Sequence, residues 1–497
     1  MRYTRVPKPP QAGSSHPIAR GSYPTLRRAR VPFISLTILG VDRSAQLAAS
    51  DAVPFSRLAW IAGALGTAAQ PHRLVVGFLL ALLLWVPGLA WDASVGATID
   101  PPGLLAEPWD DIEQDDAQRT LRRLAVQHVP DRNFEGARIP AAELAAALAL
   151  RATELGNDGN DQQAERVAAA ARRAASLAPL GNFQALAAAE ADACAAVIDG
   201  ALALDVRPIA AGFRATVIDI PAACAARSTI FACVFGAWAM LVLAVGAGAL
   251  ARMEAVQISG RGLLRPGAAV AYAVERWTTF LLSWLAPVAI AAVVGITCVA
   301  WGFLFRSNVG GWIGAALYIV PLFVGAIAGI ALLIAALGAF HAPSAIACDG
   351  LSALDASQRG AIYFLARPML WTVVLGTTLA VVTVGFAILR IIGWAITAFP
   401  AAMVDIGANG AAPVHALAIS PQHWAIPLDG RSLFIWAWVL LIAIAVAGAA
   451  ISLLVGTLTR GYLLLREACD GQPTDAVWPF ETPLDVSEVP PAARRNA

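Results

Sequence analysis

The sequence predicts an all-α fold, a polytopic bundle of about six transmembrane helices with an external helical insert. Composition is the first observation behind this prediction. Of the 497 residues, 58% are hydrophobic and 14% are charged, whereas a soluble domain carries roughly 25% charged residues. The mean hydropathy of +0.65 is the second observation. The third is a series of long apolar runs, because a helix needs about 20 apolar residues to cross a bilayer.

Six runs are long enough to cross. None shows the polar face, repeating every 3.6 residues, of a helix in a soluble protein. Tryptophans stand at several of their edges, where amphipathic rings prefer the headgroup level. The fourth run has 29 residues, so we expect it to tilt or to kink at Pro321. The runs are residues 74–91, 230–250, 280–305, 312–340, 370–391 and 433–458.

The distribution of arginine predicts that both termini are cytoplasmic. With this orientation the short inside segments hold ten arginines and the short outside segments hold two, as the positive-inside rule requires. The N-terminal region is also basic, so it could lie on anionic lipid or be a disordered tail. We therefore predict a basic, partly disordered cytoplasmic region (1–72), a first transmembrane helix (73–91), an extracytoplasmic helical insert (92–228), a five-helix transmembrane domain (229–458) and a cytoplasmic tail (459–497).

The insert carries 20 acidic residues and 12 arginines, a net charge of −8. Long loops cross the membrane largely regardless of charge, so this composition is compatible with an outside position. Its alanine-rich faces could pack on one another or form a groove for a protein partner. We predict helices at 110–128, 141–155, 161–177 and 182–204, a turn at 157–160, and an interfacial helix at 207–227.

Two segments on the predicted inside resemble each other. Residues 273–282 and 356–365 each read A-x-x-R with an aromatic residue four positions after the arginine. Each predicts a short amphipathic helix whose arginine reaches lipid phosphates. The echo suggests two related halves; chance similarity between apolar segments is the alternative.

These segments also carry a resemblance to a known group. Residues 252–257, 260–267 and 269–287, with the stretch Ile346-Ala347-Cys348-Asp349-Gly350 and the residues that follow to Pro368, resemble uncharacterised multi-pass membrane proteins known mainly from planctomycete bacteria. Ser352 stands where that group often has an acidic residue, and Gly360 where serine is common. More distantly, the helix-then-span layout is similar to the membrane domain attached to some glycerophosphodiesterases. The resemblance implies a membrane location and no reaction, since their catalytic domain has no counterpart here.

Six polar residues are candidates for an interfacial or gating role. Asp355 and Arg359 have the i, i+4 spacing of a helical ion pair, and the alternative for all loop charges is a solvated helix surface. Arg390 is the one charge within the apolar cores, and counting from Leu370 places it at the outer rim, where a long side chain can reach water. The candidates are Arg276, Asp349, Asp355, Arg359, Arg367 and Arg390.

Other motifs are weaker. Gly325 and Gly329 form a GxxxG, which we expect to serve packing within the chain rather than dimerisation. Cys194 and Cys224 could form a disulfide in an oxidising compartment; free thiols are the alternative. His341 is expected to be a boundary residue rather than a proton relay. His415 and His423 are too isolated for a metal site, and we expect neither a metal nor a cofactor.

These observations favour a non-enzymatic membrane scaffold or accessory subunit whose partners are the lipid bilayer and a protein bound through the insert. The net charge of +1 gives no field that would recruit nucleic acid. A transporter for an apolar or lipid-like solute is the alternative, since such a solute needs no charged ligands near the midplane. An intramembrane enzyme would need a cluster of Asp, His or Ser residues, which the sequence does not offer.

Overall fold

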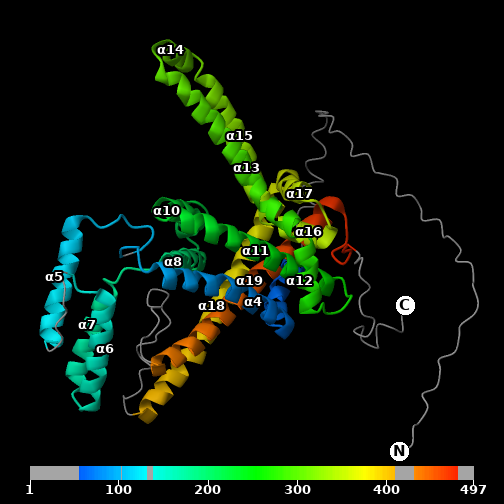
Figure 1. Cartoon of the computed structure of the whole chain (residues 1–497). Helices are drawn as coiled ribbons and strands as arrows, with labels where there is room; N and C mark the ends of the chain where they lie inside the picture. Colours follow the sequence, from blue (N-terminus) through cyan, green and yellow to red (C-terminus); the bar gives the residue numbers. More distant parts are fainter. Residues whose placement is uncertain (1–54, 102, 131–137, 409–429, 479–497) are drawn as a thin grey trace, which may run out of the picture. The chain divides into compact units, whose positions relative to one another are not determined.

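Helices account for nearly all of the computed structural model, which describes residues 55–101, 103–130, 138–408 and 430–478 (Figure 1). These residues contain no β-strand, and one antiparallel bridge joins Ile99 to Leu180. They belong to the unit Val53–Ala497, while a second unit, Met1–Ala52, lies outside the described residues, as do His415 and His423. The predicted all-α fold is confirmed.

The long apolar helices correspond closely to the predicted spans. Five helices in the described residues are long and apolar enough to cross a membrane, and a bent pair makes up to six. The bend of 53° divides the fourth predicted run just before Pro321, close to the expected kink. The five helices are Pro71–Val95, Val206–Arg227, Thr229–Ile258, Pro368–Val404 and Leu433–Asp470, and the pair is Asn308–Ala316 with Ile319–Ile330.

Two segments differ from the expectation. The third predicted run lies in α13 (Trp277–Gly302), but its apolar segments Trp277–Ala286 and Ala292–Arg306 are each shorter than a span. Conversely, the predicted interfacial helix meets the length and hydropathy of a span. It consists of α9 (Val206–Arg214), a π-helical turn η2 (Ala215–Asp219) and α10 (Ile220–Arg227). Its regularly spaced charges are the feature that favours an interfacial position.

The remaining helices extend the predicted regions. Short helices form inside the predicted N-terminal region, and the last helix runs through the first part of the predicted C-terminal tail. The helices not yet given are α2 (Phe55–Ala59), η1 (Trp60–Ala62), α3 (Gly63–Ala68), α4 (Pro71–Val95), α5 (Asp111–His128), α6 (Ala141–Asn157), α7 (Asp161–Ala175), α8 (Asn182–Ala203), α11 (Thr229–Ile258), α12 (Pro266–Glu275), η3 (Phe303–Arg306), α14 (Asn308–Ala316), α15 (Ile319–Ala339), α16 (Ala342–Asp349), α17 (Ala353–Ala366), α18 (Pro368–Ala408) and α19 (Gly430–Asp470).

The insert folds as the sequence predicts. Asp110 and Glu113 cap the start of α5 reciprocally, which satisfies two backbone donors that the first turn leaves free. Helices α6 and α7 pack against each other and share a small core with α5 that includes Leu121, Leu144 and Val167. The predicted helices of the insert are therefore confirmed, to within two residues at each end.

Asp92 joins the first span to the insert. Its carboxylate, near the end of α4, accepts hydrogen bonds of 2.9 Å from the backbone amides of both Phe183 and Gln184. Those amides belong to the first turn of α8, where a negative charge is favoured by the helix dipole. The Phe183 ring then packs edge-on against Trp85 of α4. Asp92 therefore links the last turn of α4 to the first turn of α8.

Glycine lets α4 and α19 touch through their backbones. A Cβ atom placed on Gly77 would lie 2.3 Å from the Gly448 carbonyl oxygen, and one on Gly448 would lie 2.5 Å from the Gly77 oxygen. A similar approach brings Gly338 of α15 against Gly360 of α17. Small residues of this kind allow membrane helices to gain close contacts in a solvent that supplies no hydrophobic drive between them.

The GxxxG makes no close contact among the described residues, since none of their atoms outside the helix's own backbone lies within 4 Å of a Cβ placed on Gly325 or Gly329. Its expected role in packing within the chain stays a prediction. Helix α15 instead contacts α17 at Gly338, nearer its other end. The spacing of two glycines shows that a close approach is sterically allowed, but it does not show which helix face meets a neighbour.

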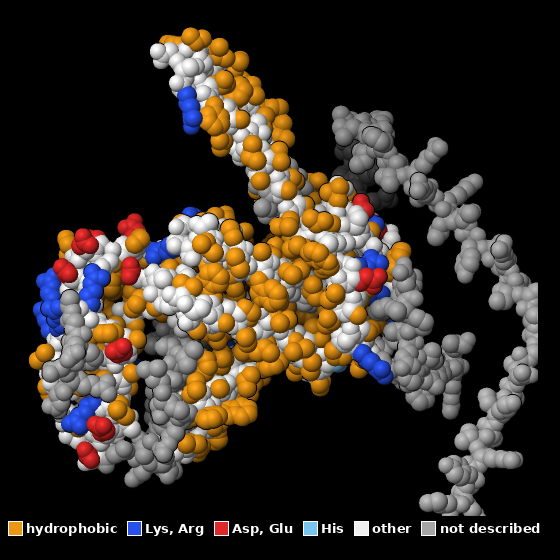
Figure 2. Space-filling view, in the orientation of Figure 1, with side chains coloured by type: hydrophobic (Ala, Val, Ile, Leu, Met, Phe, Trp, Pro, Cys, Tyr) orange, Lys and Arg blue, Asp and Glu red, His pale blue; other side chains and the backbone are white. Residues whose placement is uncertain are grey.

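Large apolar side chains cover the outside of the long helices. On α4 the side chains of Val75, Leu79 and Leu83 are about half exposed, and on α14 that of Trp312 is 81% exposed. Figure 2 shows hydrophobic side chains spread over α13, α14 and α15 and over α18 and α19, while charged side chains gather on the α5–α7 part of the insert. Exposed apolar area of this extent marks a membrane-facing surface. The chain is therefore a membrane protein.

The contact between α4 and α19 gives a stability prediction. Gly77→Ala inserts a methyl group against the Gly448 backbone, so we expect a loss of about 1–3 kcal/mol, typical of overpacking. The measurement is thermal denaturation of the purified protein in detergent. Gly376→Ala is the matched control, since Gly376 of α18 has open space around it, and it should leave the melting temperature unchanged or slightly higher. Equal losses from the two variants would refute the packing role of Gly77.

Candidate functional site

Glu254 is the centre of a buried ionic cluster, which we call the glutamate cluster (Thr67, Arg73, Glu254 and Arg460). Its carboxylate forms ion pairs with Arg73 of α4 and with Arg460 of α19, the latter at 2.5 Å. Thr67 of α3 donates a further hydrogen bond of 3.1 Å. Glu254 is 0% and Arg73 1% exposed. Two guanidinium groups therefore share one carboxylate away from water.

The cluster ties the N-terminal helices into the bundle. Nη1 of Arg460 donates a hydrogen bond of 2.8 Å to the Trp60 carbonyl oxygen, and the Arg460 guanidinium lies 5.0 Å from the Trp60 ring centre. Ile61 and Ala64, on the neighbouring turns, are fully buried. Residues 55–69, which the sequence analysis assigned to the basic N-terminal region, are thus a packed part of the transmembrane domain.

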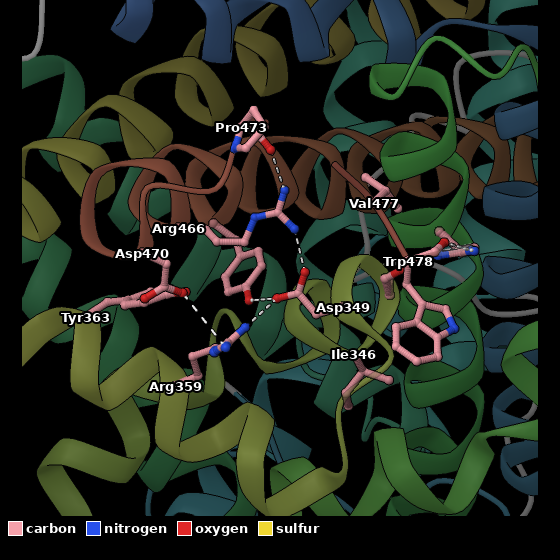
Figure 3. Close-up of polar contacts among 12 residues, drawn as sticks. Ile346, Asp349, Arg359, Tyr363, Arg466, Asp470, Pro473, Val477 and Trp478 are labelled. Carbon is pink, nitrogen blue, oxygen red and sulfur yellow. Dashed lines mark hydrogen bonds and ion pairs between the residues drawn. The ribbon is translucent and has the colours of Figure 1, made fainter. Parts of the chain in front are cut away.

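Asp349 is the centre of a second group, the aspartate cluster (Asp349, Arg359, Tyr462 and Arg466; Figure 3). One carboxylate oxygen accepts from Arg466 at 2.5 Å. The other accepts from Arg359 at 2.8 Å and from the Tyr462 hydroxyl at 2.5 Å. These partners come from α17 and α19. Asp349 itself ends α16, a short helix that is buried from Ala342 to Cys348.

The local sequence explains why α16 stops at Asp349. Gly350 follows with φ of 65°, in the left-handed region that glycine adopts without steric cost. The Gly350 carbonyl oxygen accepts a hydrogen bond of 3.3 Å from Arg276. The chain then turns into α17, whose N-cap Ser352 accepts from the Asp355 amide. The glycine thus leaves Asp349 directed at α17 and α19.

Tyr363 and Asp470 extend the aspartate cluster. The Tyr363 hydroxyl donates 2.5 Å to the Asp470 carboxylate, which also lies 3.9 Å from Arg359. Burial raises the pKa of Tyr363, and the hydrogen bond to Asp470 raises it further. The phenol therefore stays protonated and acts as a hydrogen-bond donor.

Three of the six candidate residues meet at the end of α16. Asp349 and Arg359 form an ion pair, and Arg276 binds the neighbouring Gly350. The two arginines of the sequence echo therefore converge on adjacent residues. They do so from different local positions, because Arg276 lies between α12 and α13 whereas Arg359 lies within α17.

The other three candidates lie on α17, on α18 or between them. Asp355 forms a hydrogen bond with Ser352 at the start of α17, and the ion pair with Arg359 that the spacing permits does not form, because that arginine binds Asp349 instead. Arg367 caps the end of α17 through its backbone amide. Arg390 is exposed on α18, about 33 Å from Pro368 at 1.5 Å per residue, roughly one hydrocarbon thickness. Its rim position stays a prediction.

Sequence analysis missed the residues that are most deeply buried. The ten arginines that the sequence analysis counted in the short cytoplasmic segments include Arg252, Arg460 and Arg466. The exposed fractions of these three residues are 0%, 7% and 0%. Arg73 was not singled out, and Glu254 entered only within the stretch 252–257 that carries the resemblance. The one signal that could have found them is position, because each charge lies within a continuous helix that also contains an apolar run. Which charges pair depends on contacts across more than 100 residues of sequence.

Neither cluster has the chemistry of a catalytic centre. Each central carboxylate already accepts from two guanidinium groups and a hydroxyl, which occupies the oxygens that a general base would use. Burial raises the pKa of the Cys348 thiol, so it lacks thiolate character. No group of three or more His, Cys, Asp or Glu residues able to hold a metal occurs in the described part of the chain.

Two further residues are placed by the structure. Cys194 and Cys224 are free thiols and do not form the disulfide that the sequence analysis considered. His341, predicted to be a boundary residue, lies between α15 and α16 and is 1% exposed. Its ring centre is 6.4 Å from that of Trp371 and 6.5 Å from that of Tyr462. Burial lowers the pKa of His341 to about 4, against the opposing effect of the Leu458 carbonyl.

Comparisons of the chain with protein-family models, with curated proteins and with solved structures found no match. The resemblance to planctomycete membrane proteins and to the membrane domain of glycerophosphodiesterases therefore stays a prediction. What can be concluded about function comes from the two clusters and from the helices that they join.

Removal of the central carboxylate tests the glutamate cluster. Glu254→Ala leaves Arg73 and Arg460 buried without their counter-charge, which typically costs about 3–5 kcal/mol. We expect a correspondingly lower melting temperature in detergent. Glu154→Ala is the control, because Glu154 pairs with Arg151 at 3.0 Å on the exposed surface of α6, where a pair contributes about 0–1 kcal/mol. Similar losses in both variants would mean that the cluster is not a structural centre.

His341 predicts a loss of stability in acid. Its pKa is about 4 when folded and about 6.5 when unfolded, so below pH 6.5 the unfolded chain binds a proton that the folded chain excludes. Stability should therefore fall between pH 6.5 and pH 4, by about 3 kcal/mol in total. The check is denaturation across this range for the wild type and for His341→Gln. The difference in stability between the two should change over this range; a constant difference would contradict the assignment.

Proposed function

We propose that the protein is a non-enzymatic scaffold or accessory subunit of the bacterial cytoplasmic membrane. The observation that carries this proposal is the closed centre of the bundle. Gly77 and Gly448 bring α4 and α19 into backbone contact, and Glu254 joins the same two helices to α11. A solute pathway between these helices would require both contacts to open. A rigid centre of this kind suits a protein that holds others in place.

The glutamate cluster also supports the proposed orientation, with both termini cytoplasmic. It gathers the start of α4, the end of α11 and the end of α19, which are the ends that a six-span alternation assigns to one side. Arginine-rich ends favour the cytoplasmic side. The segment Val206–Arg227 would then lie at the outer interface, where α9 packs on α8 and α10 on α11.

The insert is the part proposed to bind a protein partner. Its helices α5, α6 and α7 have their own core, so they form a surface independent of the spans. Helix α5 leaves Ile112 and Val126 exposed at 67% and 75%. The insert's charge of −8 favours a partner with a basic surface. These features are compatible with docking outside the membrane.

A lipid-solute transporter is the second candidate. The observation in its favour is the 53° bend between α14 and α15, since helices broken within the membrane are common at transporter binding sites. Helices α13 and α15 contact α16 and α17, and α13 also contacts α11, which carries Glu254. The residues of the glutamate cluster lie on α3, α4, α11 and α19, so movement of α14 and α15 need not break their contacts.

Site-specific photo-crosslinking in native membranes tests the scaffold. A photoreactive residue in place of Val126 should give one discrete adduct of higher mass, because this side chain faces the proposed partner. The same residue in place of Glu154, also exposed on the insert, is the control and should give little adduct. A discrete adduct of equal yield at both positions would contradict docking through α5.

Reconstitution separates the two candidates. The purified protein in vesicles should leave the rate at which a fluorescent lipid crosses the bilayer at the level of protein-free vesicles. Acceleration that Gly329→Trp abolishes without altering the melting temperature would favour the transporter. Absence of both adduct and acceleration would reject both candidates.

A further inference from the structure

The chain beyond α19 lies against the end of α16, α11 and the loop after α11, and we call the site that it occupies there the groove. We call residues 471–478 the strap. It begins where Gly471, with φ of 68°, ends α19, and a turn from Pro473 to Ala476 follows. Figure 3 shows it passing from Pro473 above Arg466 to Trp478 beside the α16 corner. Most of its residues are exposed.

Three arginines hold the strap by its main chain. Arg466 donates a hydrogen bond of 2.8 Å to the Pro473 carbonyl oxygen. Arg261 and Arg252 donate hydrogen bonds of 3.1 Å to the carbonyl oxygens of Val477 and Trp478, respectively. In return the Trp478 amide donates 2.7 Å to the Cys348 oxygen, the last but one carbonyl of α16. The contacts therefore come from α11, from the loop after it, from α16 and from α19.

Only two side chains of the strap are recognised. Val477 is 4% exposed and belongs to the main hydrophobic core. The Trp478 indole lies over Gly350, so closely that a Cβ there would be 3.0 Å from the ring. Carbonyl contacts are independent of sequence, whereas this apolar position followed by an aromatic one is selective.

The groove favours acidic ligands. Its walls present guanidinium groups, while the strap contains Asp475 and the next residues add Glu481, Asp485 and Glu488 before any arginine. Most residues of the strap are exposed and it follows the end of α19, so it can open by local unfolding at a lower free-energy cost than the helices around it. The groove can therefore be vacated without unfolding the helices around it.

We propose that this groove is a peptide-binding site, occupied in the free protein by the strap and open to an acidic, extended peptide of a partner protein that carries an apolar residue followed by an aromatic one. The strap is the resident competitor, present at the millimolar effective concentration of a short tether. The site lies apart from the insert and does not depend on the scaffold role.

Binding of a labelled peptide to the full-length protein in detergent tests the proposal. The probe is a fluorescent peptide with the sequence of residues 471–478. Wild type should bind it weakly, because the strap competes. Val477→Asp removes the resident anchor and should bind it at least tenfold more tightly. Gln472→Asp introduces the same side chain at an exposed strap position and should bind it like wild type.

A second peptide and a second readout keep the test decisive if Val477→Asp folds poorly. The peptide carrying Val477→Asp should not bind any variant. In wild type, excess unlabelled peptide should speed hydrogen exchange at the Trp478 amide at least threefold. Equal binding by all variants, or unchanged exchange, would overturn the proposal. Displacement of the peptide by inorganic phosphate at low millimolar concentration would show an anion site instead.

Discussion

The carboxylate of Glu254 is the constraint on which the arrangement of the bundle depends. A buried guanidinium needs a counter-charge or several hydrogen-bond acceptors, because the loss of hydration is large in a low-dielectric interior. Here two of them, from helices at opposite ends of the chain, depend on one carboxylate. Helices α4, α11 and α19 must therefore meet at that point. The packing of Thr67 and Trp60 against the same groups then places the N-terminal helices as well.

Two kinds of contact stabilise the packing of the spans, namely ion pairs and close packing. Helices in lipid gain no hydrophobic free energy from meeting each other, so they rely on close packing and on polar groups. The pair α4 and α19 uses both, with glycine contact at Gly77 and an ion pair one turn away through Arg73. Helices α13 and α15 pack on each other and on the short helices α16 and α17, and α13 also packs on α11. Close packing therefore holds these two helices, together with a buried hydrogen bond of 3.0 Å from Ser357 to the Ser283 carbonyl.

Sequence reasoning recovered what local chemistry determines. Hydropathy located the spans, and the predicted helix at 110–128 begins within one residue of α5. It failed where the outcome depends on distant partners. Arg252 and Arg460 look like ordinary cytoplasmic charges, and only the folded chain shows that both are buried. Arg359 likewise pairs with Asp349 rather than with Asp355. The i, i+4 spacing on a helix permits an ion pair but does not require one.

The position of these charges along the chain has a consequence for biosynthesis. Arg73 and Glu254 leave the ribosome first, so the ion pair that joins α4 to α11 can form before α19 is made. Arg460 emerges about 200 residues later and adds an unbalanced cation to a pair that is already satisfied. Its entry is compensated by the Trp60 carbonyl and ring, so the docking of the last helix depends on an N-terminal segment made long before it.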